Sequence, residues 1–395
     1  MFYAIVRTFR NPKTTPSVIP TRFFANLSVK YDENPEAKSR AWQIHSYGGL
    51  EDLKLSNVRI PVISKPNEVL VKIDASSVNP IDVAMARGYG STIFNFMRKT
   101  KNLNLEPEIE FPLTLGRDFS GTIVSKGHGV GDRIKLGDEV WGVVPIDRQG
   151  CHANYVTVDS CLVNPRPQNI SSVEAASILY AGLTAWSALW ITGGLCYKIA
   201  IPARINRRVL VLGGSGGVGT LAIQLLKAWN SHVITTCSSD AVNMLIELGA
   251  DVVIDYKEDS ADDRIVDEGP YDIILDCCQQ GPDTIKEKGY PHKTYITLNS
   301  PLLKNVDQHG LIGGTVKNIG DLVKYNIPSR ENKSSVRWGF FTPSRAGINM
   351  IQELVESGQI LPVIHKTYSF EDLPKAYERV AEGHLRGKHV IDMKQ

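Results

Sequence analysis

The motif with the clearest chemistry in this chain of 395 residues is a turn with five glycines, at positions 213, 214, 216, 217 and 219. An apolar run of strand type, residues 208–212, enters the turn, and an apolar helical pattern leaves it. Glycines permit a tight turn and the close approach of a pyrophosphate, and the helix N-terminus supplies amide donors. Because a second strand-like run follows at 232–236, we expect a dinucleotide to bind here. The residues expected against its pyrophosphate are Ser215, Gly217, Val218 and Gly219.

The tip of the second strand bears on which dinucleotide binds. Sites that prefer NAD usually hold an acidic residue about twenty positions after the glycine turn, where it accepts hydrogen bonds from the ribose. Ser238 stands nearest that position, and with Ser239 it can donate hydrogen bonds to a 2′-phosphate. Lys257 is the nearest following cation, and Asp240 would reach the ribose if the register differed by two. The pattern favours NADPH over NADH as the cofactor.

Composition and charge exclude several function classes. A net charge of +2 gives no electrostatic support for binding nucleic acid or a membrane surface. We find no apolar run of membrane-spanning length and expect no integral membrane segment. The six cysteines contain no C-x-x-C pair, which indicates free thiols in a reducing compartment. The length predicts two domains.

The N-terminus differs from the rest of the chain in its charge. It carries five basic residues and no acid before Asp32, and Phe2, Ile5, Val6 and Phe9 would share one face of a short helix. A basic, acid-free and amphipathic start is typical of a mitochondrial presequence. We therefore expect residues 1–24 to be a presequence that is cleaved in the mitochondrion. A disordered basic tail is the alternative.

The elements that must position these residues fall into three regions. Residues 41–169 read as β-rich, and the periodicity becomes helical from residue 173. Strands and helices then alternate from 209 to 276, which predicts a doubly wound parallel sheet, with a further strand at 295–298. Residues 304–332 look less regular and would form a lid or an interface. The last elements are expected as a helix at 346–358, a strand at 363–367, a helix at 373–382 and a strand at 388–393.

Seven motifs follow one another from about residue 41 to the end. They lie at residues 79–82, 115–121, 137–142, 181–186, 213–219, 248–256 and 386–390. In this order they resemble the medium-chain dehydrogenase/reductase superfamily, and within it the zinc-free quinone oxidoreductase branch. The resemblance implies an α/β fold with a GroES-like β-barrel catalytic domain and a Rossmann domain. It implies a first catalytic part at 41–169, an NADP-binding domain at 170–339 and a return to the catalytic domain at 340–395. It also suggests a homodimer and a protein partner.

The resemblance departs from the zinc alcohol dehydrogenases at the metal site. A catalytic zinc needs about three converging Cys, His or acidic ligands. Those relatives hold a cysteine in the stretch that here runs from Asn79 to Asp82, and a His-Glu pair where this chain has Arg117 and Asp118. No replacement ligand set is evident in the sequence. We therefore expect no metal and a direct hydride transfer to an electrophilic acceptor, a quinone or a related enone.

The resemblance also implies three candidate catalytic residues. Asn79 and Asp82 would lie near the nicotinamide, with Asn79 orienting the acceptor or the ring, whereas Asp82 either caps the turn after Pro80 or acts chemically. Tyr89 matches a tyrosine that helps hold the thioester carbonyl, or delivers a proton, in related 2-enoyl thioester reductases. A phenol would also serve a quinone, and a tyrosine that merely closes a loop is the alternative.

Four further positions are implied to contact the cofactor, with plain packing as the alternative. Tyr256 would stack against the adenosine ribose-phosphate, and Leu298 would form the nicotinamide wall. Lys388 and His389 would close over the cofactor.

Three functions therefore stay open. The first is a mitochondrial NADPH-dependent quinone or enone reductase. The second is a 2-enoyl thioester reductase, for which Arg98, Lys99 and Lys101 would form a basic patch for an acyl carrier. The third is an NADPH-binding interaction protein with little turnover. Nucleic-acid binding has no support in the sequence.

Overall fold

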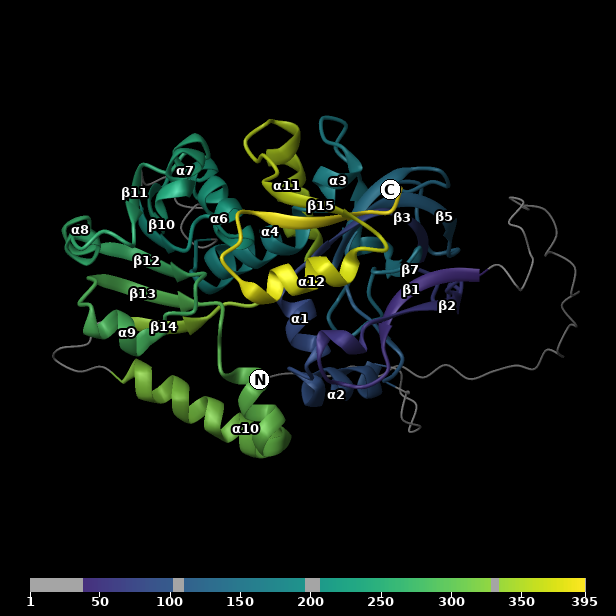
Figure 1. Ribbon diagram of the computed structural model, residues 1–395, viewed down its shortest axis with the longest axis horizontal. Coiled ribbons are helices and arrows are strands. Elements are labelled where there is room, and N and C mark those ends of the chain that lie inside the picture. The colour runs from purple at the N-terminus through teal and green to yellow at the C-terminus, as the bar shows by residue number, and fades with distance from the viewer. Residues whose placement is uncertain (1–37, 102–109, 196–206, 328–333, 395) are drawn as a thin grey trace, which may run out of the picture. The chain divides into compact units, whose positions relative to one another are not determined.

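Two large β-sheets carry the chain in this computed structural model, which describes residues 38–101, 110–195, 207–327 and 334–394 (Figure 1). The expected presequence, residues 1–24, lies outside the described residues. The two large sheets differ in their strand directions.

The first large sheet is mainly antiparallel and has seven strands. Its strands are β3 (Glu68–Val78), β5 (Asp118–Lys126), β6 (Glu139–Val143), β7 (Tyr155–Asp159), β8 (Val163–Pro165), β15 (Ile364–Ser369) and β16 (Lys388–Asp392). A small sheet of β1 (Lys38–Ile44), β2 (Lys54–Arg59) and β4 (Leu113–Thr114) accompanies it. Because β16 pairs antiparallel with β3, the C-terminal segment returns to the sheet built from the first third of the chain. The boundaries near residues 169 and 339 stay predictions.

The second large sheet is parallel, with the order β11-β10-β9-β12-β13-β14. Its strands are β9 (Arg208–Leu212), β10 (His232–Cys237), β11 (Val252–Asp255), β12 (Tyr271–Asp276), β13 (His292–Thr297) and β14 (Ser335–Trp338). The central strand β9 is a continuous apolar run, and residues 209–212 are fully buried because both faces of a parallel sheet are covered. The expected α/β class with a doubly wound parallel sheet is confirmed.

Helices cover the sheets and connect them. They are α1 (Pro80–Ala86), α2 (Ser91–Lys101), α3 (Ser172–Ala175), α4 (Leu179–Trp186), α6 (Gly217–Ala228), α7 (Val242–Glu247), α8 (Ala261–Asp267), α9 (Pro282–Glu287), α10 (Leu302–Asn326), α11 (Arg345–Glu356) and α12 (Leu373–Glu382). Short helical turns lie at Leu50–Asp52, Ser160–Leu162 and Ser239–Ala241, and a π-helical turn at Ser187–Thr192 extends α4.

The prediction of an irregular stretch at residues 304–332 is wrong over most of its length, because helix α10 spans Leu302–Asn326. Four glycines at 310, 313, 314 and 320 lower helix propensity and obscure the periodicity. The helix is interrupted at Gly310, whose φ is 71°. Packing stabilises it, since the Asp307 carboxylate accepts hydrogen bonds from the backbone N–H groups of Gly90 and Thr92.

One helical stretch, Ser172–Thr192, is long and apolar enough to cross a membrane by length and composition alone. In the fold, 83% of its window is buried, as is typical of a core helix. The five described cysteines, Cys151, Cys161, Cys237, Cys277 and Cys278, are free, in line with the expected thiols, and Cys196 lies outside the described residues.

Candidate functional site

The glycine turn between β9 and α6 is shaped by its backbone. Gly213 has a φ of 79°, in the left-handed region where glycine is favoured. A Cβ at Gly219 would lie 2.4 Å from the Gly213 carbonyl oxygen, so only glycine allows the helix to approach the strand this closely. A Cβ at Gly216 would meet nothing nearer than 3.7 Å. The turn is therefore closed on its inner side and open on the side where α6 begins.

A cleft of about 790 Å³ extends along the open side of this turn. Eight of the residues predicted from the sequence line it: Asn79, Ser215, Gly217, Val218, Gly219, Ser238, Tyr256 and Lys388. The other four, Asp82, Tyr89, Leu298 and His389, are not among the residues that line it. The structure thus brings together residues from five separate parts of the described chain.

The outer end of the cleft holds a charged group that sequence reasoning missed. Arg386 donates hydrogen bonds to the Ser238 and Ser215 hydroxyls and to both carboxylate oxygens of Asp240. The backbone N–H of the next residue, Gly387, donates to the Ser215 carbonyl at 2.8 Å. The hydrogen bond with Arg386, joined by one from Ser238, lowers the pKa of Asp240 to about 2. Arg386 stands 146 residues from Asp240, so local spacing could not place it, although it begins the 386–390 motif.

The inner end of the cleft lies over buried polar groups. Lys388 Nζ donates a hydrogen bond to Asn79 Oδ1 and lies 3.8 Å from Asp118 Oδ2. Asn79 Nδ2 in turn donates to Asp118 Oδ1 at 3.1 Å, and Ser77 Oγ donates to the same oxygen at 2.6 Å. Burial raises the pKa of Asp118, and the Lys388 charge opposes this. Asn79 therefore has a fixed orientation, with its amide held between an ammonium and a carboxylate.

Asp82 lies beneath this layer and has a structural environment. It is fully buried, and its carboxylate accepts hydrogen bonds from the backbone N–H groups of Asn79 and Gly116. Asn79 and Asp82 form a capping box at the start of α1, and Arg117 Nε lies 3.7 Å from Asp82. Burial raises the pKa of Asp82 and the Arg117 charge opposes this. Of the two roles left open for Asp82, this geometry favours ordering the loop.

The remaining predicted residues lie near the cleft but outside its lining. Tyr89 is in the loop that joins α1, which lines the cleft, to α2; burial and the Asp307 charge raise its pKa. Leu298 packs against the core. His389 points away, because neighbouring residues of a strand face opposite sides, and its ring centroid lies 5.0 Å from that of His365. Burial lowers the pKa of His389 to about 4.

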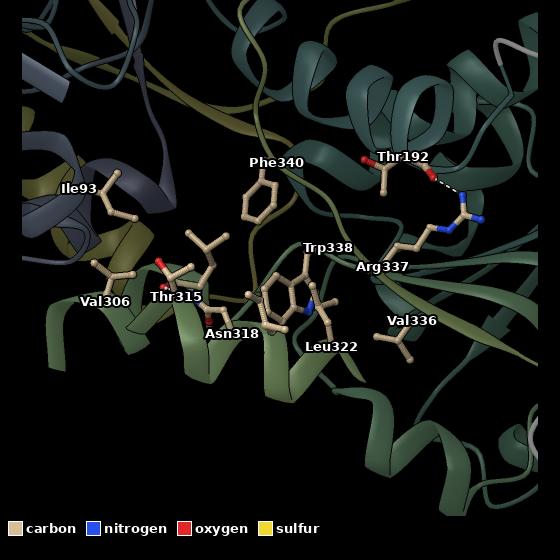
Figure 2. Close-up of a pocket in the computed structure, with 12 residues that line it drawn as sticks. Ile93, Thr192, Val306, Thr315, Asn318, Leu322, Val336, Arg337, Trp338 and Phe340 are labelled. Carbon is tan, nitrogen blue, oxygen red and sulfur yellow. Dashed lines mark hydrogen bonds between the residues drawn. The ribbon is translucent and has the colours of Figure 1, made fainter. Parts of the chain in front are cut away.

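A second cavity, of about 640 Å³, is lined mostly by apolar side chains from α2, α10, β14 and Phe340, which follows β14 (Figure 2). Its lining residues include Ile93, Val306, Ile319, Trp338 and Phe340. The charged member of the lining, Arg337, donates a hydrogen bond to the carbonyl of Thr192, which also lines the pocket, at 2.6 Å (Figure 2). We call this cavity the apolar pocket.

One ring stack connects neighbours of the pocket lining with neighbours of the cleft lining. Phe340 lines the pocket, and the next residue, Phe341, stacks on Tyr180 with ring centroids 4.3 Å apart. Tyr180 precedes Ala181, which lines the cleft. The lining of the pocket and the lining of the cleft are therefore connected through the Tyr180–Phe341 stack.

Among the described residues, no group of three His, Cys, Asp or Glu side chains is arranged to hold a metal ion. The inner end of the cleft instead contains the ammonium of Lys388 between Asn79 and Asp118.

Comparison with known proteins places this geometry in context. Residues 65–168 match the family described as alcohol dehydrogenase GroES-like domain, and residues 248–391 match zinc-binding dehydrogenase. The chain is 48% identical over 365 residues to NAD(P)H oxidoreductase RTN4IP1, mitochondrial, of Drosophila melanogaster, covering 91% of this chain and 87% of the relative. Identity to the Homo sapiens protein of the same name is 42%, over 89% of each. The solved quinone oxidoreductase from Coxiella burnetii is 26% identical with a TM-score of 0.68, over 90% of this chain and 99% of that one.

These matches bear on two expectations. The GroES-like and Rossmann architecture expected from the motifs is confirmed. The mitochondrial location is also confirmed, because the similar proteins are named as mitochondrial. Cleavage of residues 1–24 stays a prediction.

Proposed function

The chain belongs to the RTN4IP1 family of NAD(P)H oxidoreductases within the medium-chain dehydrogenase/reductase superfamily, and on this basis we propose that it is an NADPH-dependent reductase of a quinone or related enone. The observation that carries the proposal is a single cleft with an arginine and two serines at one end and a buried polar cluster at the other, beside an apolar pocket. The first end fits a phosphate, and the second end with the pocket fits an apolar acceptor with polar oxygens.

NADPH fits the residues present. The open side of Gly216 leaves room for a pyrophosphate, which Gly217, Val218 and Gly219 would contact. Arg386, with Ser238 and Ser215, would hold the 2′-phosphate, because a guanidinium and hydroxyls are strong donors to phosphate oxygens. Tyr256, half exposed at the cleft, would cover the adenosine side. When bound, the nicotinamide supplies a hydride, which carries two electrons and one proton.

The apolar pocket supports a quinone as the acceptor class. Ligand sites for apolar rings are lined by hydrophobic and aromatic side chains with a few polar groups that fix orientation. The pocket provides the first part through Trp338 and Phe340, and Asn79 provides a polar group whose orientation is fixed. The resemblance to the Coxiella burnetii protein, which is named a quinone oxidoreductase, points the same way.

A 2-enoyl thioester reductase is the second candidate, and Tyr89 is the observation that favours it. Its loop joins the helix that lines the cleft to the helix that lines the pocket, and its raised pKa keeps the phenol protonated as a donor. The basic patch expected for an acyl carrier is weakened, because Arg98 donates hydrogen bonds to Asn95 and Glu110. Lys99 is exposed, and the Lys101 side chain lies outside the described residues.

The protein partner and the homodimer that the resemblance suggests stay predictions. The third alternative, an NADPH-binding interaction protein with little turnover, would keep the same cleft. Turnover separates this alternative from the other two.

The test is the oxidation of NADPH, followed by absorbance, by the full chain. A soluble benzoquinone and a short enoyl-CoA are compared as acceptors, and NADH replaces NADPH as the control. We expect quinone-dependent oxidation with a preference for NADPH. The rate of quinone reduction should change less than about threefold in Tyr89→Phe, because the tyrosine phenol, a weak proton donor, contributes little when the reduced product is itself acidic. Enoyl-CoA reduction that is lost in Tyr89→Phe would instead establish the second candidate. Saturable NADPH binding without turnover would establish the third.

A further inference from the structure

Lys388 is an unusual residue for the floor of a cleft, because it is 5% exposed and carries a charge. Burying an ammonium is costly unless the charge is paired and its donors are satisfied. Its counterion is Asp118, at 3.8 Å, since Asp82, the second buried carboxylate whose charge acts on Lys388, lies beside Arg117. The lysine is thus held by charge balance, not by a full set of hydrogen bonds.

The Lys388 ammonium has more N–H donors than protein acceptors around it. A lysine has three N–H donors, and within the described part of the chain its hydrogen bond goes to Asn79 Oδ1. Asp118 Oδ2 is beyond hydrogen-bond distance at 3.8 Å. Because Lys388 lines the cleft, a remaining N–H can reach an oxygen that enters the inner end.

The backbone keeps the lysine in this position. A Cβ at Gly217 would lie 2.8 Å from Lys388 Cδ, so the glycine leaves room for the lysine stem to cross the turn. The preceding Gly387 has a φ of 70°, and a Cβ there would lie 2.2 Å from the Val363 carbonyl oxygen. The Lys388 backbone N–H donates to that same carbonyl at 2.9 Å. The lysine is therefore presented to the cleft by a pinned segment.

We propose that Lys388 Nζ is the electrophilic and proton-donating group for the acceptor, a role distinct from cofactor contact. The inference rests on the proposed function. The acceptor gains a hydride at the inner end, and one of its oxygens then carries a negative charge, which the ammonium stabilises. The Nζ–H bond breaks as an O–H bond forms, so that quinone becomes hydroquinone. Lys388 is left as a neutral amine and regains a proton from water in the open cleft.

Two properties of the site suit this role. Burial lowers the pKa of Lys388, against the opposing charges of Asp118 and Asp82, which brings the ammonium closer to an acid that works near neutral pH. Asn79 is a positioning residue, because its amide holds the ammonium on one side and Asp118 on the other.

The test compares Lys388→Met, which keeps the length of the stem and removes the charge, with Lys375→Met as a matched control on the surface of α12, where the lysine side chain is 70% exposed. We expect Lys388→Met to lower kcat about 100-fold with quinones whose hydroquinones are weak acids, since a positioned proton donor contributes about 10²–10⁴-fold. NADPH affinity, measured by fluorescence, should change less than about threefold in both variants. An equal loss in NADPH affinity and in kcat would overturn the proposal in favour of plain cofactor contact.

A readout that does not need turnover accompanies this assay. A halogenated phenol that is ionised at neutral pH resembles the charged oxygen of the reduced acceptor, and its binding in the presence of NADP⁺ is followed by calorimetry. We expect Lys388→Met to abolish this binding and Lys388→Arg to keep it while losing kcat, because an arginine holds its proton too firmly to donate it. Unchanged phenolate binding in Lys388→Met would overturn the proposal.

Two further results distinguish a wrong role for Lys388 from misfolding of the variant and from a wrong proposed function. Lys388→Met combined with Asp118→Asn removes both charges, so a folded double variant that still lacks phenolate binding supports the proposal. If the unmodified chain turned over no quinone, the proposed function would fail, whereas loss of phenolate binding in Lys388→Met would still identify the anion site.

Discussion

The cofactor cleft and the apolar pocket are built in different ways. The cleft is shaped by backbone, because its glycine turn must have a left-handed residue at Gly213 and no Cβ at Gly219. The apolar pocket is shaped by side chains from α10, β14 and Phe340, together with Ile93 of α2, which is far from them in the sequence. A site shaped by the backbone requires glycines at a fixed spacing, which can be recognised in the sequence. A site shaped by apolar side chains has no such spacing, and its residues cannot be distinguished in the sequence from those of a hydrophobic core.

The largest effect is expected from breaking the backbone of the cleft. Gly219→Ala would place a methyl group 2.4 Å from the Gly213 carbonyl oxygen, so either the helix or the turn must move. Overpacking of this kind costs about 1–3 kcal/mol, and we expect NADPH affinity to fall about 100-fold. Titration of NADPH fluorescence measures this. Gly131→Ala is the control, because a Cβ there meets nothing within 4 Å. Equal affinities in the two variants would mean that the turn does not hold the cofactor.

The next effect concerns the outer end of the cleft. Arg386→Ala removes a charged donor beside Ser238, and hydrogen bonds to charged groups contribute about 1.5–3 kcal/mol. We expect NADPH affinity to fall about 10–100-fold while NADH affinity changes less than about twofold. Arg264→Ala, in a surface ion pair with Glu258, is the control. An equal loss for both cofactors would show that Arg386 serves the fold, not the 2′-phosphate.

A smaller effect is expected from the apolar pocket. Ile319 lines it and is 58% exposed, so Ile319→Lys introduces a charge without burying it in the core. Losing the burial of one such side chain against a ligand costs about 1.5 kcal/mol, and we expect KM for a quinone with an alkyl tail to rise about tenfold. KM for unsubstituted benzoquinone should rise less. Ile246→Lys on α7, at 55% exposure, is the control. If both variants behaved alike, the pocket would not hold the acceptor.

The smallest effect is expected from a substitution on the face of β16 that points away from the cleft. Lys388 faces the cleft, whereas the neighbouring His389 is buried on the other side, with a pKa lowered by burial to about 4. As the pH falls, the His389 imidazole is therefore protonated in the unfolded chain before it is protonated in the folded one. Its contribution to the free energy of unfolding is present above pH 6.5 and is lost as the pH falls toward 4. We expect His389→Leu to reduce the loss between pH 7 and pH 5 by about 1 kcal/mol in urea unfolding. The same loss in both proteins would assign the acid sensitivity to other groups, such as His152.

The sequence predicted most of the fold, and eight of the twelve site residues that it proposed line the cleft. The strands and helices from 208 to 276 were predictable because buried parallel strands read as continuous apolar runs. The helix α10 was not, because its glycines weaken the periodic signal and packing against α2 overrides low propensity. Arg386 could not be assigned a partner because the contact with Ser238 spans 148 residues. His389 was grouped with Lys388 because adjacency in sequence does not reveal which residue of a strand faces the cleft.

The central claim is that NADPH bound in the cleft transfers a hydride to an apolar quinone. A single-turnover experiment tests it most directly. The full chain is loaded with one equivalent of NADPH and mixed in a stopped-flow instrument with a short-tailed quinone, and the absorbance of NADPH and of the quinone are followed together. The account predicts that bound NADPH and quinone disappear at the same rate and in equal amounts, and more slowly in Lys388→Met. Bound NADPH that persists in the presence of excess quinone would contradict it.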